Sequence, residues 1–220
     1  MPADSGRFVH DRDSVEFARV LTFSDGMFAI AMTLLVVGIE VPDIPDTEDV
    51  GELWDAIGDL YPSIISFVIS FAVIGRYWMA HHQFFSLLKG ITLPVIGLNL
   101  IYLLFIAFLP FPTGLLGNFF ENPLAFTIYA VAVAVVSGME VVLLLGARRA
   151  DLLTRPLPDD VYRWGMVQSL SPVVFFLASI PVAFLVDPSW AVAIWFLGVP
   201  FQLITSRWKP EDADALLSGP

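Results

Sequence analysis

Apolar residues gather in six long runs, which are separated by polar or proline-containing stretches. Each run has roughly 20 residues, the length of an α-helix that crosses a hydrocarbon layer of about 30 Å. Backbone groups in lipid must be satisfied within the segment, and the runs are not the shorter alternating strands of a membrane barrel. The pattern therefore predicts an all-α polytopic membrane protein with six transmembrane helices, at about 17–39, 60–80, 91–109, 124–145, 162–186 and 189–205.

The third run is followed by Pro110, Phe111 and Pro112. Proline interrupts helical hydrogen bonding, so this sequence is predicted to end the third helix. The residues that follow, through Phe120, are apolar enough to keep the connection near the membrane surface.

The 11 lysine and arginine residues predict the orientation of the chain. They precede or open the first run, follow the last, or flank the second and fourth connections, and the other three connections contain none. Because basic residues accumulate on the cytoplasmic side, both termini are predicted to be cytoplasmic. The chain then divides into an N-terminal segment at 1–16, a transmembrane unit at 17–206 and a tail at 207–220.

The connection between the first two runs is strongly acidic. It contains eight carboxylates and no basic residue: Glu40, Asp43, Asp46, Glu48, Asp49, Glu52, Asp55 and Asp59. Repeated around an oligomer axis, this charge would concentrate cations at the mouth of a pore. A solvated loop that satisfies the topology rule explains the same composition.

Composition excludes several classes of function. The chain is 57% hydrophobic and 15% charged and has no cysteine, so disulfides and thiolate metal or redox sites are excluded. No nucleophile with a base, no phosphate-binding glycine loop and no cluster of basic residues stands out. We therefore predict no enzymatic activity, no metal site, no cofactor and no binding of nucleic acid.

The first run carries polar residues near its beginning, at Arg19, Ser24 and Asp25. A charge facing lipid is costly, so Asp25 must face protein or water. Beyond it, a stripe at helical spacing comprises Ile30, Thr33, Leu34 and Val37. Such a stripe could border an ion path, and ordinary packing between membrane helices explains it as well.

The second run ends with Trp78, His81 and His82. Adjacent histidines on a helix point about 100° apart, which makes them poor partners for one zinc ion. One of them could instead bind Asp25 or Ser24, and a belt of aromatic and histidine residues at the headgroups is the alternative. Asn99 lies at a depth where it could join this cluster, and Glu140 is expected to pair with Arg76 or Arg148.

Two motifs resemble the transmembrane protein 175 family of potassium-permeable channels. The first is Arg19 with Phe23-Ser24-Asp25 and its apolar continuation through Leu34, and the second is Trp78 followed by His81-His82. The resemblance implies a prokaryotic member with one six-helix unit per chain, which assembles as a homotetramer with the first helix lining a central pore.

The resemblance also implies roles for particular residues. The pore constriction would be a hydrophobic ring at Ile30, with Leu34 and Val37 in further layers, and Thr33 would influence ion preference. A structural network would hold the first helix in place, and it would comprise Arg19, Phe23, Ser24, Asp25, Trp78, His81 and His82.

The sequence and the resemblance together predict a potassium-permeable homotetrameric channel in the bacterial plasma membrane, with potassium and other monovalent cations as the permeant species. The alternative is a proton-coupled secondary transporter of a small solute that uses Asp25, His81 or Glu140. A third possibility is a scaffold that conducts nothing.

Overall fold

The computed structural model describes residues 9–210 and 213, and these residues form six helical spans that are long and apolar enough to cross a membrane. The prediction of six transmembrane helices is confirmed. Three of the spans are continuous helices, α3 (Tyr61–Ser86), α6 (Pro123–Arg149) and α7 (Asp159–Leu185). The other three are each built from two consecutive helices: α1 (Val15–Leu34) with η1 (Leu35–Gly38), α4 (Leu93–Phe108) with α5 (Pro110–Asn118), and α8 (Pro188–Phe196) with α9 (Gly198–Ser206).

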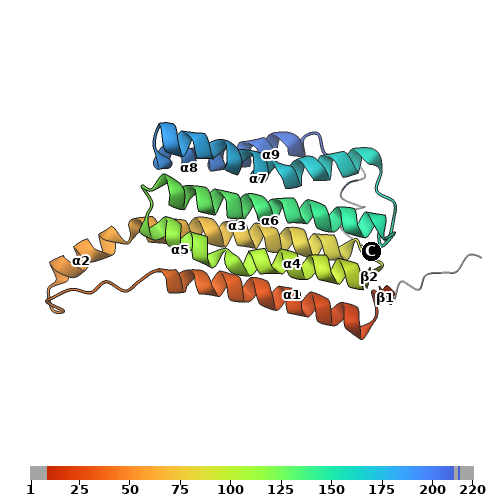
Figure 1. The fold of residues 1–220 in the computed structure, drawn as a ribbon, viewed down its shortest axis with the longest axis horizontal. Coiled ribbons are helices and arrows are strands. Elements are labelled where there is room, and N and C mark those ends of the chain that lie inside the picture. Colours follow the sequence, from red (N-terminus) through yellow and green to blue (C-terminus); the bar gives the residue numbers. More distant parts are fainter. Residues whose placement is uncertain (1–8, 211–212, 214–220) are drawn as a thin grey trace, which may run out of the picture.

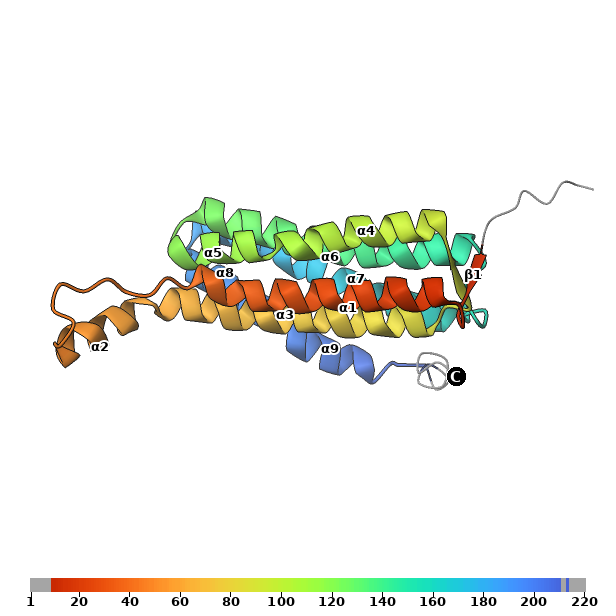
Figure 2. The ribbon, with the colours of Figure 1, turned by 90° about the horizontal axis from the view of Figure 1, so that it is seen from below.

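The spans lie roughly parallel (Figures 1 and 2), and in the view of Figure 1 α6 lies in the middle. On one side of α6 lie α1, α3 and α4–α5, and on the other side lie α7, α8 and α9. Half of the most apolar window of α6 is buried, against 22% for α1. The main core is accordingly built on α6, where Phe126, Tyr129 and Val133 are at most 1% exposed.

The third span does not end at its prolines, so that prediction is wrong. The chain remains helical through Leu109, whose φ and ψ are −55° and −34°, and α5 starts at Pro110. Proline is tolerated there because the first residues of a helix have no intrahelical partner for their N–H groups. Thr113 helps to bridge the break, since its backbone N–H and its hydroxyl both donate to the carbonyl of Leu109, at 3.1 and 2.8 Å.

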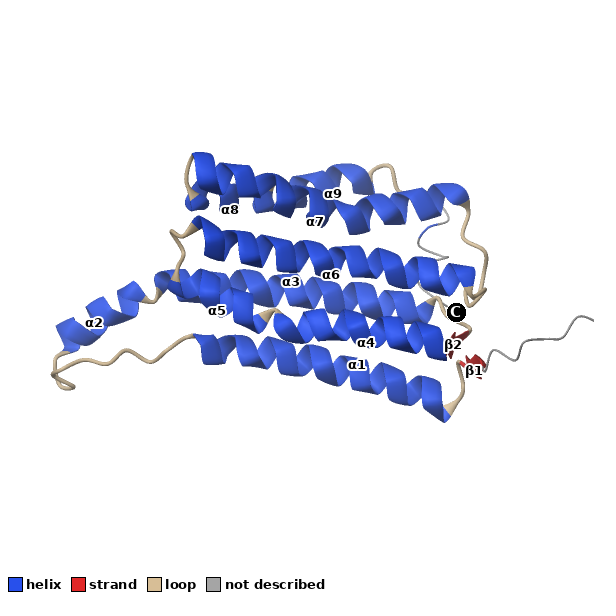
Figure 3. Cartoon of the chain, viewed as in Figure 1, coloured by secondary structure: helices blue, strands red, loops and turns tan. Residues whose placement is uncertain are grey.

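A short antiparallel sheet, coloured red in Figure 3, ties the start of the chain to the α3–α4 connection. Strand β1 (Val9–Asp11) pairs with β2 (Gly90–Thr92), and Leu88 bridges to Leu153 beyond α6. The sequence pattern did not predict these strands. The sheet lies at the same end of the bundle as the end of α9, and we call this end the terminal end. Which end faces the cytoplasm stays a prediction, and part of segments 1–16 and 207–220 lies outside the described residues.

The acidic connection was predicted as a loop, but its second half is a helix, α2 (Val50–Asp59). Asp49 caps α2, because its carboxylate accepts hydrogen bonds from the backbone of Gly51 and Glu52 at 2.7 and 3.1 Å. None of its residues is buried, and α2 projects from the end of the bundle opposite the terminal end (Figure 1). The acidic side chains therefore extend beyond the spans.

Candidate functional site

The predicted stripe on the first helix lies on an exposed face. Ile30, Leu34 and Val37 are 55, 46 and 72% exposed, and Thr33 is exposed beside them. The opposite face is packed, since Phe28 and Ala31 are each 1% exposed. Helix α1 is thus held along one side only, at the edge of its layer (Figure 1).

Local geometry sets the direction of these side chains. The hydroxyl of Thr33 donates to the carbonyl of Ile30 at 2.9 Å, so its one proton is held by its own helix. After Leu34 the chain tightens into the 3₁₀ turn η1, in which residues three apart are eclipsed. Val37 consequently follows Leu34 along one line of the same face.

The packed side of α1 contains a buried hydrogen-bonded chain. Asn99 of α4 donates from Nδ2 to the Ser24 hydroxyl at 3.0 Å, and its Oδ1 lies 2.8 Å from Nε2 of His81 on α3. All three residues are at most 2% exposed. We call this group the Ser24–Asn99–His81 chain, and it joins α1, α4 and α3.

The direction of each hydrogen bond in the chain is fixed. Ser24 uses its hydroxyl proton on the carbonyl of Val20 at 2.8 Å, so it can only accept from Asn99. The Oδ1 of Asn99 can only accept, and Nε2 of His81 must therefore carry a proton. His81 is further enclosed by Tyr102, stacked at 5.6 Å, and by Phe28 at 5.3 Å between ring centroids.

Asp25 is paired, as expected, but its partner is the indole of Trp78 rather than a histidine. The Trp78 Nε1–H donates to Asp25 Oδ1 at 2.9 Å. The His82 ring lies 6.0 Å from the Trp78 ring and is exposed. The histidine that reaches α1 is His81, and it does so through Asn99 to Ser24.

Two members of the predicted network lie outside it. Arg19 is exposed and makes no hydrogen bond or ion pair within residues 9–210 and 213, and Phe23 is 52% exposed. Conversely, the prediction assigned no role to Tyr102. Its position one turn after Asn99 on α4, at spacing i, i+3, is the signal that could have found it.

Glu140 pairs with Arg76, one of its two predicted partners, with Glu140 Oε2 and Arg76 Nη1 3.7 Å apart. Arg148 lies instead 3.8 Å from Asp159. In the described part of the chain, no three His, Asp or Glu side chains are grouped in a way that could hold a metal ion.

Fold and site together define a polytopic membrane protein in which α1, at the edge of the bundle, exposes an apolar stripe. The opposite face of α1 is bound to α3 and α4 by buried polar side chains. Residues 19–110 match the family model of the endosomal/lysosomal potassium channel TMEM175. A potassium channel of Chamaesiphon minutus is 36% identical over 195 residues, which cover 82% of this chain and 93% of that channel. The chain belongs to the transmembrane protein 175 (TMEM175) family, a family of ion channels and not of enzymes.

Two further matches agree with this family assignment. A potassium channel of Streptomyces collinus is 40% identical over 121 residues, which cover 55% of this chain and 57% of that channel. The crystal structure of a lysosomal potassium-selective channel TMEM175 homolog from Chamaesiphon minutus superposes with a TM-score of 0.70 at 28% identity, over 86% of this chain and 98% of that one. The chain is an integral membrane protein, and its bacterial relatives assign it to the bacterial plasma membrane. The transporter alternative is set aside, because the family consists of ion channels.

Proposed function

We propose that this protein is a potassium-permeable cation channel, a homotetramer in which four copies of α1 surround the pore. The observation that carries the proposal is the exposure of the α1 stripe, whose opposite face is fastened to α3 and α4 by the Ser24–Asn99–His81 chain. A pore-lining helix needs a free inner face and a rigid attachment behind it. The permeant ion is taken to be potassium because the bacterial relatives are potassium channels.

The narrowest ring of this pore is formed by Ile30, with Leu34 and Val37 as further apolar layers and Thr33 as the polar position among them. Hydrophobic constrictions restrict ion flow by excluding water, so discrimination among monovalent cations arises from the cost of dehydration. The acidic residues of α2 and of the segment before it raise the cation concentration at the mouth of the pore. Arg19 and Phe23, exposed in the single subunit, then lie on the inner face or at a subunit contact.

Ion flux through liposomes tests the constriction. Ile30→Asn is expected to raise potassium flux several-fold, because the amide holds water in the ring. Ile204→Asn is the matched control: Ile204 is 51% exposed, but it lies on α9 in the layer farthest from α1. An unchanged flux in Ile30→Asn, or an equal rise in both variants, contradicts the constriction. Absence of any flux from wild-type protein supports the scaffold instead.

Disulfide cross-linking tests the shared axis. Since the chain has no cysteine, Ile30→Cys introduces a single thiol per subunit. Mild oxidation in membranes is expected to give covalent dimers from Ile30→Cys and none from Ile204→Cys. Monomers alone from Ile30→Cys would place α1 away from a common axis.

A further inference from the structure

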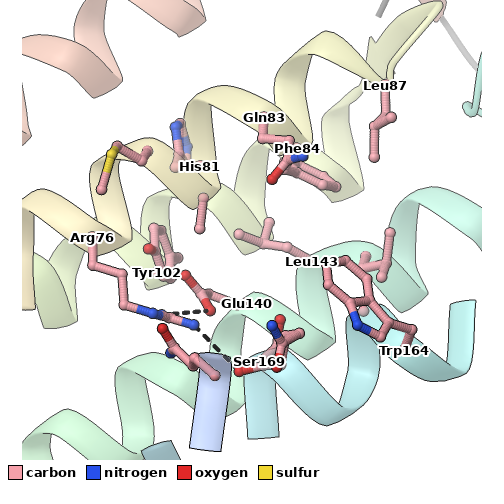
Figure 4. Close-up of a pocket in the computed structure, with 16 residues that line it drawn as sticks. Arg76, His81, Gln83, Phe84, Leu87, Tyr102, Glu140, Leu143, Trp164 and Ser169 are labelled. Atoms are coloured by element: carbon pink, nitrogen blue, oxygen red, sulfur yellow. Dashed lines mark hydrogen bonds and ion pairs between the residues drawn. The ribbon is translucent and has the colours of Figure 1, made fainter. Parts of the chain in front are cut away.

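Helix α3 has a second side, on which it faces α6, α7 and α9 instead of α1. A cavity of about 320 Å³ lies there (Figure 4). The residues that line it include Arg76, Ala80 and Gln83 of α3, Glu140 of α6, and Trp164 and Gln168 of α7. Its lining, as far as the structure is described, includes no residue of α1, so the cavity is separate from the proposed pore.

The cavity gathers nearly all the unsatisfied polar atoms of the interior. Among the described residues, six buried side-chain nitrogen and oxygen atoms lack a hydrogen-bond partner, and five of them belong to residues that line this cavity. These five are Arg76 Nη1, His81 Nδ1, Tyr102 Oη and both carboxylate oxygens of Glu140. Buried polar atoms are normally satisfied by protein or by ordered water. Their concentration around one space indicates that the space supplies their partners.

The ion pair at the cavity has room for an intermediary. Figure 4 shows Arg76 and Glu140 pointing toward one another from α3 and α6. Their 3.7 Å separation is longer than a direct hydrogen bond, and Arg76 Nη2 already donates to the carbonyl of Gln168 at 3.3 Å. The Glu140 side chain is only 10% exposed, yet it accepts no hydrogen bond from the described residues. A water molecule, or a proton on Glu140 itself, is the missing donor.

The other groups around Glu140 do not donate a hydrogen bond to its carboxylate. From α3 it faces Arg76 and Tyr77, and the Tyr77 hydroxyl is already engaged with Ser137 at 2.6 Å. From α4 comes Tyr102, whose hydroxyl has no partner in the described chain. The α7 and α9 walls contribute the neutral side chains Trp164, Gln168, Ser169 and Gln202.

The cavity extends from the ion pair toward the terminal end, and its polar side chains are concentrated near Arg76, where Glu140, Gln168 and Gln202 lie. Its α3 wall runs from Arg76 to Leu87, about 16 Å along the helix, and Leu87 is the C-cap of α3 beside the β1–β2 sheet. A second cavity of about 250 Å³ continues the groove in the other direction. Arg76 and Gln202 line both cavities, and the second is otherwise lined mainly by apolar residues such as Ile69, Val73 and Phe175. The ion pair thus lies where the two cavities meet, with the cavity toward the terminal end on one side and a mainly apolar cavity on the other.

We propose that this cavity is a water-filled proton-binding site in each subunit, where Glu140 exchanges a proton with the aqueous phase at the terminal end. A space of about 320 Å³ is large enough to hold several water molecules. A hydronium ion transfers its proton to a carboxylate oxygen of Glu140, which leaves water and a neutral carboxylic acid. Arg76 keeps its charge throughout, so each transfer changes the net charge of the cavity by one.

Cysteine labelling tests the water. Ala80→Cys places a thiol in the cavity wall, and Val142→Cys is the matched control, since Val142 is 39% exposed outside the cavity at a similar depth. Ala80 lies six residues before the end of α3, and Val142 lies seven before the end of α6. A hydrophilic thiol reagent is expected to label Ala80→Cys about tenfold faster, because only a hydrated thiol ionises readily. Equal rates, or no labelling of Ala80→Cys, overturn the proposal.

Infrared difference spectroscopy tests the proton. Across a pH titration of purified protein, the carbonyl band of a protonated, water-accessible carboxyl group is expected in the wild type and lost in Glu140→Gln. Glu121→Gln, at an exposed position before α6, keeps the band. Glu140→Asp, which retains a carboxyl group, shifts the band and replaces the Gln variant if the latter does not fold. A Glu140→Gln spectrum identical to the wild type, or no shift in Glu140→Asp, overturns the proposal.

Discussion

The two sides of α3 contain similar polar residues but differ in how those residues are satisfied. Toward α1 and α4, His81, Asn99 and Ser24 form an uninterrupted chain of buried hydrogen bonds. Toward α7 and α9, Arg76 and Glu140 line an open cavity and leave polar atoms without partners in the described chain. Polar groups in a membrane protein are thus accommodated in two ways, by direct contact between close helices or by water between separated ones.

On the side of α3 that faces α1 and α4, small residues allow the helices to approach closely. A methyl group at Gly117 of α5 would lie 2.9 Å from the Cα atom of Ser63 on α3, so the two backbones nearly touch. Nearby, the hydroxyl oxygens of Thr113 and Ser70 lie 2.8 Å apart and those of Ser70 and Tyr129 lie 2.9 Å apart, so each pair shares a hydrogen bond. Small residues permit this spacing between membrane helices, and their short side chains then hydrogen-bond directly. This side of α3 is therefore the rigid support on which α1 rests.

Among substitutions that test the difference between the two sides of α3, Asn99→Leu is expected to reduce the unfolding free energy most. The substitution fills the space but leaves Ser24 and His81 without their shared partner. Two buried groups that each lose a hydrogen bond cost about 2–4 kcal/mol of unfolding free energy together. Reversible unfolding in mixed detergent micelles measures this loss. Asn118→Leu, at an exposed position at the end of α5, is the control, and equal losses in the two variants would show that the chain is not structurally important.

A smaller effect is expected from Gly117→Ala. The added methyl group meets the backbone of Ser63, which cannot rotate away, and such overpacking costs about 1–3 kcal/mol. Gly114, three residues earlier on α5, has no atom within 4 Å of the corresponding position. Gly114→Ala is therefore expected to raise the melting temperature slightly, because alanine favours the helix. If both variants shift the melting temperature in the same direction, the close contact of α3 and α5 at Gly117 does not determine the effect on stability.

Trp78→Phe is expected to cost about 1 kcal/mol, since it removes the indole hydrogen bond to Asp25 but keeps an aromatic ring next to His82. Thermal unfolding measures the change. Trp54→Phe on α2 serves as the control, because Trp54 is 74% exposed. A stability change no larger than that of the control would mean that water replaces the indole at Asp25.

The spans and much of the network could be predicted from the sequence because lipid imposes simple constraints. Apolar length alone locates the helices, and the cost of a charge in lipid requires a partner for Asp25. The identity of that partner could not be predicted, since Trp78 and His81 both lie within reach and only the rotation of α3 decides between them. The break at Pro110 was also misjudged, because proline ends one helix and begins another equally well.

The cavity beside Glu140 could not be predicted at all. Its existence depends on the distance between α3 and α7, which is set by packing of many side chains rather than by any local pattern. The pairing of Arg76 with Glu140 was anticipated, but whether the pair is enclosed by protein or surrounded by water is invisible in a list of residues.

The smallest effect is expected from Arg76→Gln, and it distinguishes a wet cavity from a dry one. Removing one partner of a dry, buried ion pair costs about 3–5 kcal/mol, because the other charge is left uncompensated. A pair surrounded by water contributes about 0–1 kcal/mol. Lys89→Gln is the reference for the loss of unfolding free energy when a solvated ion pair is broken. Lys89 and Asp151 are 3.1 Å apart, and their side chains are 49 and 96% exposed. If Arg76→Gln changes the unfolding free energy as little as Lys89→Gln, water solvates Glu140 within the span. A loss near the larger value would mean that both sides of α3 are dry, and the contrast between them would disappear.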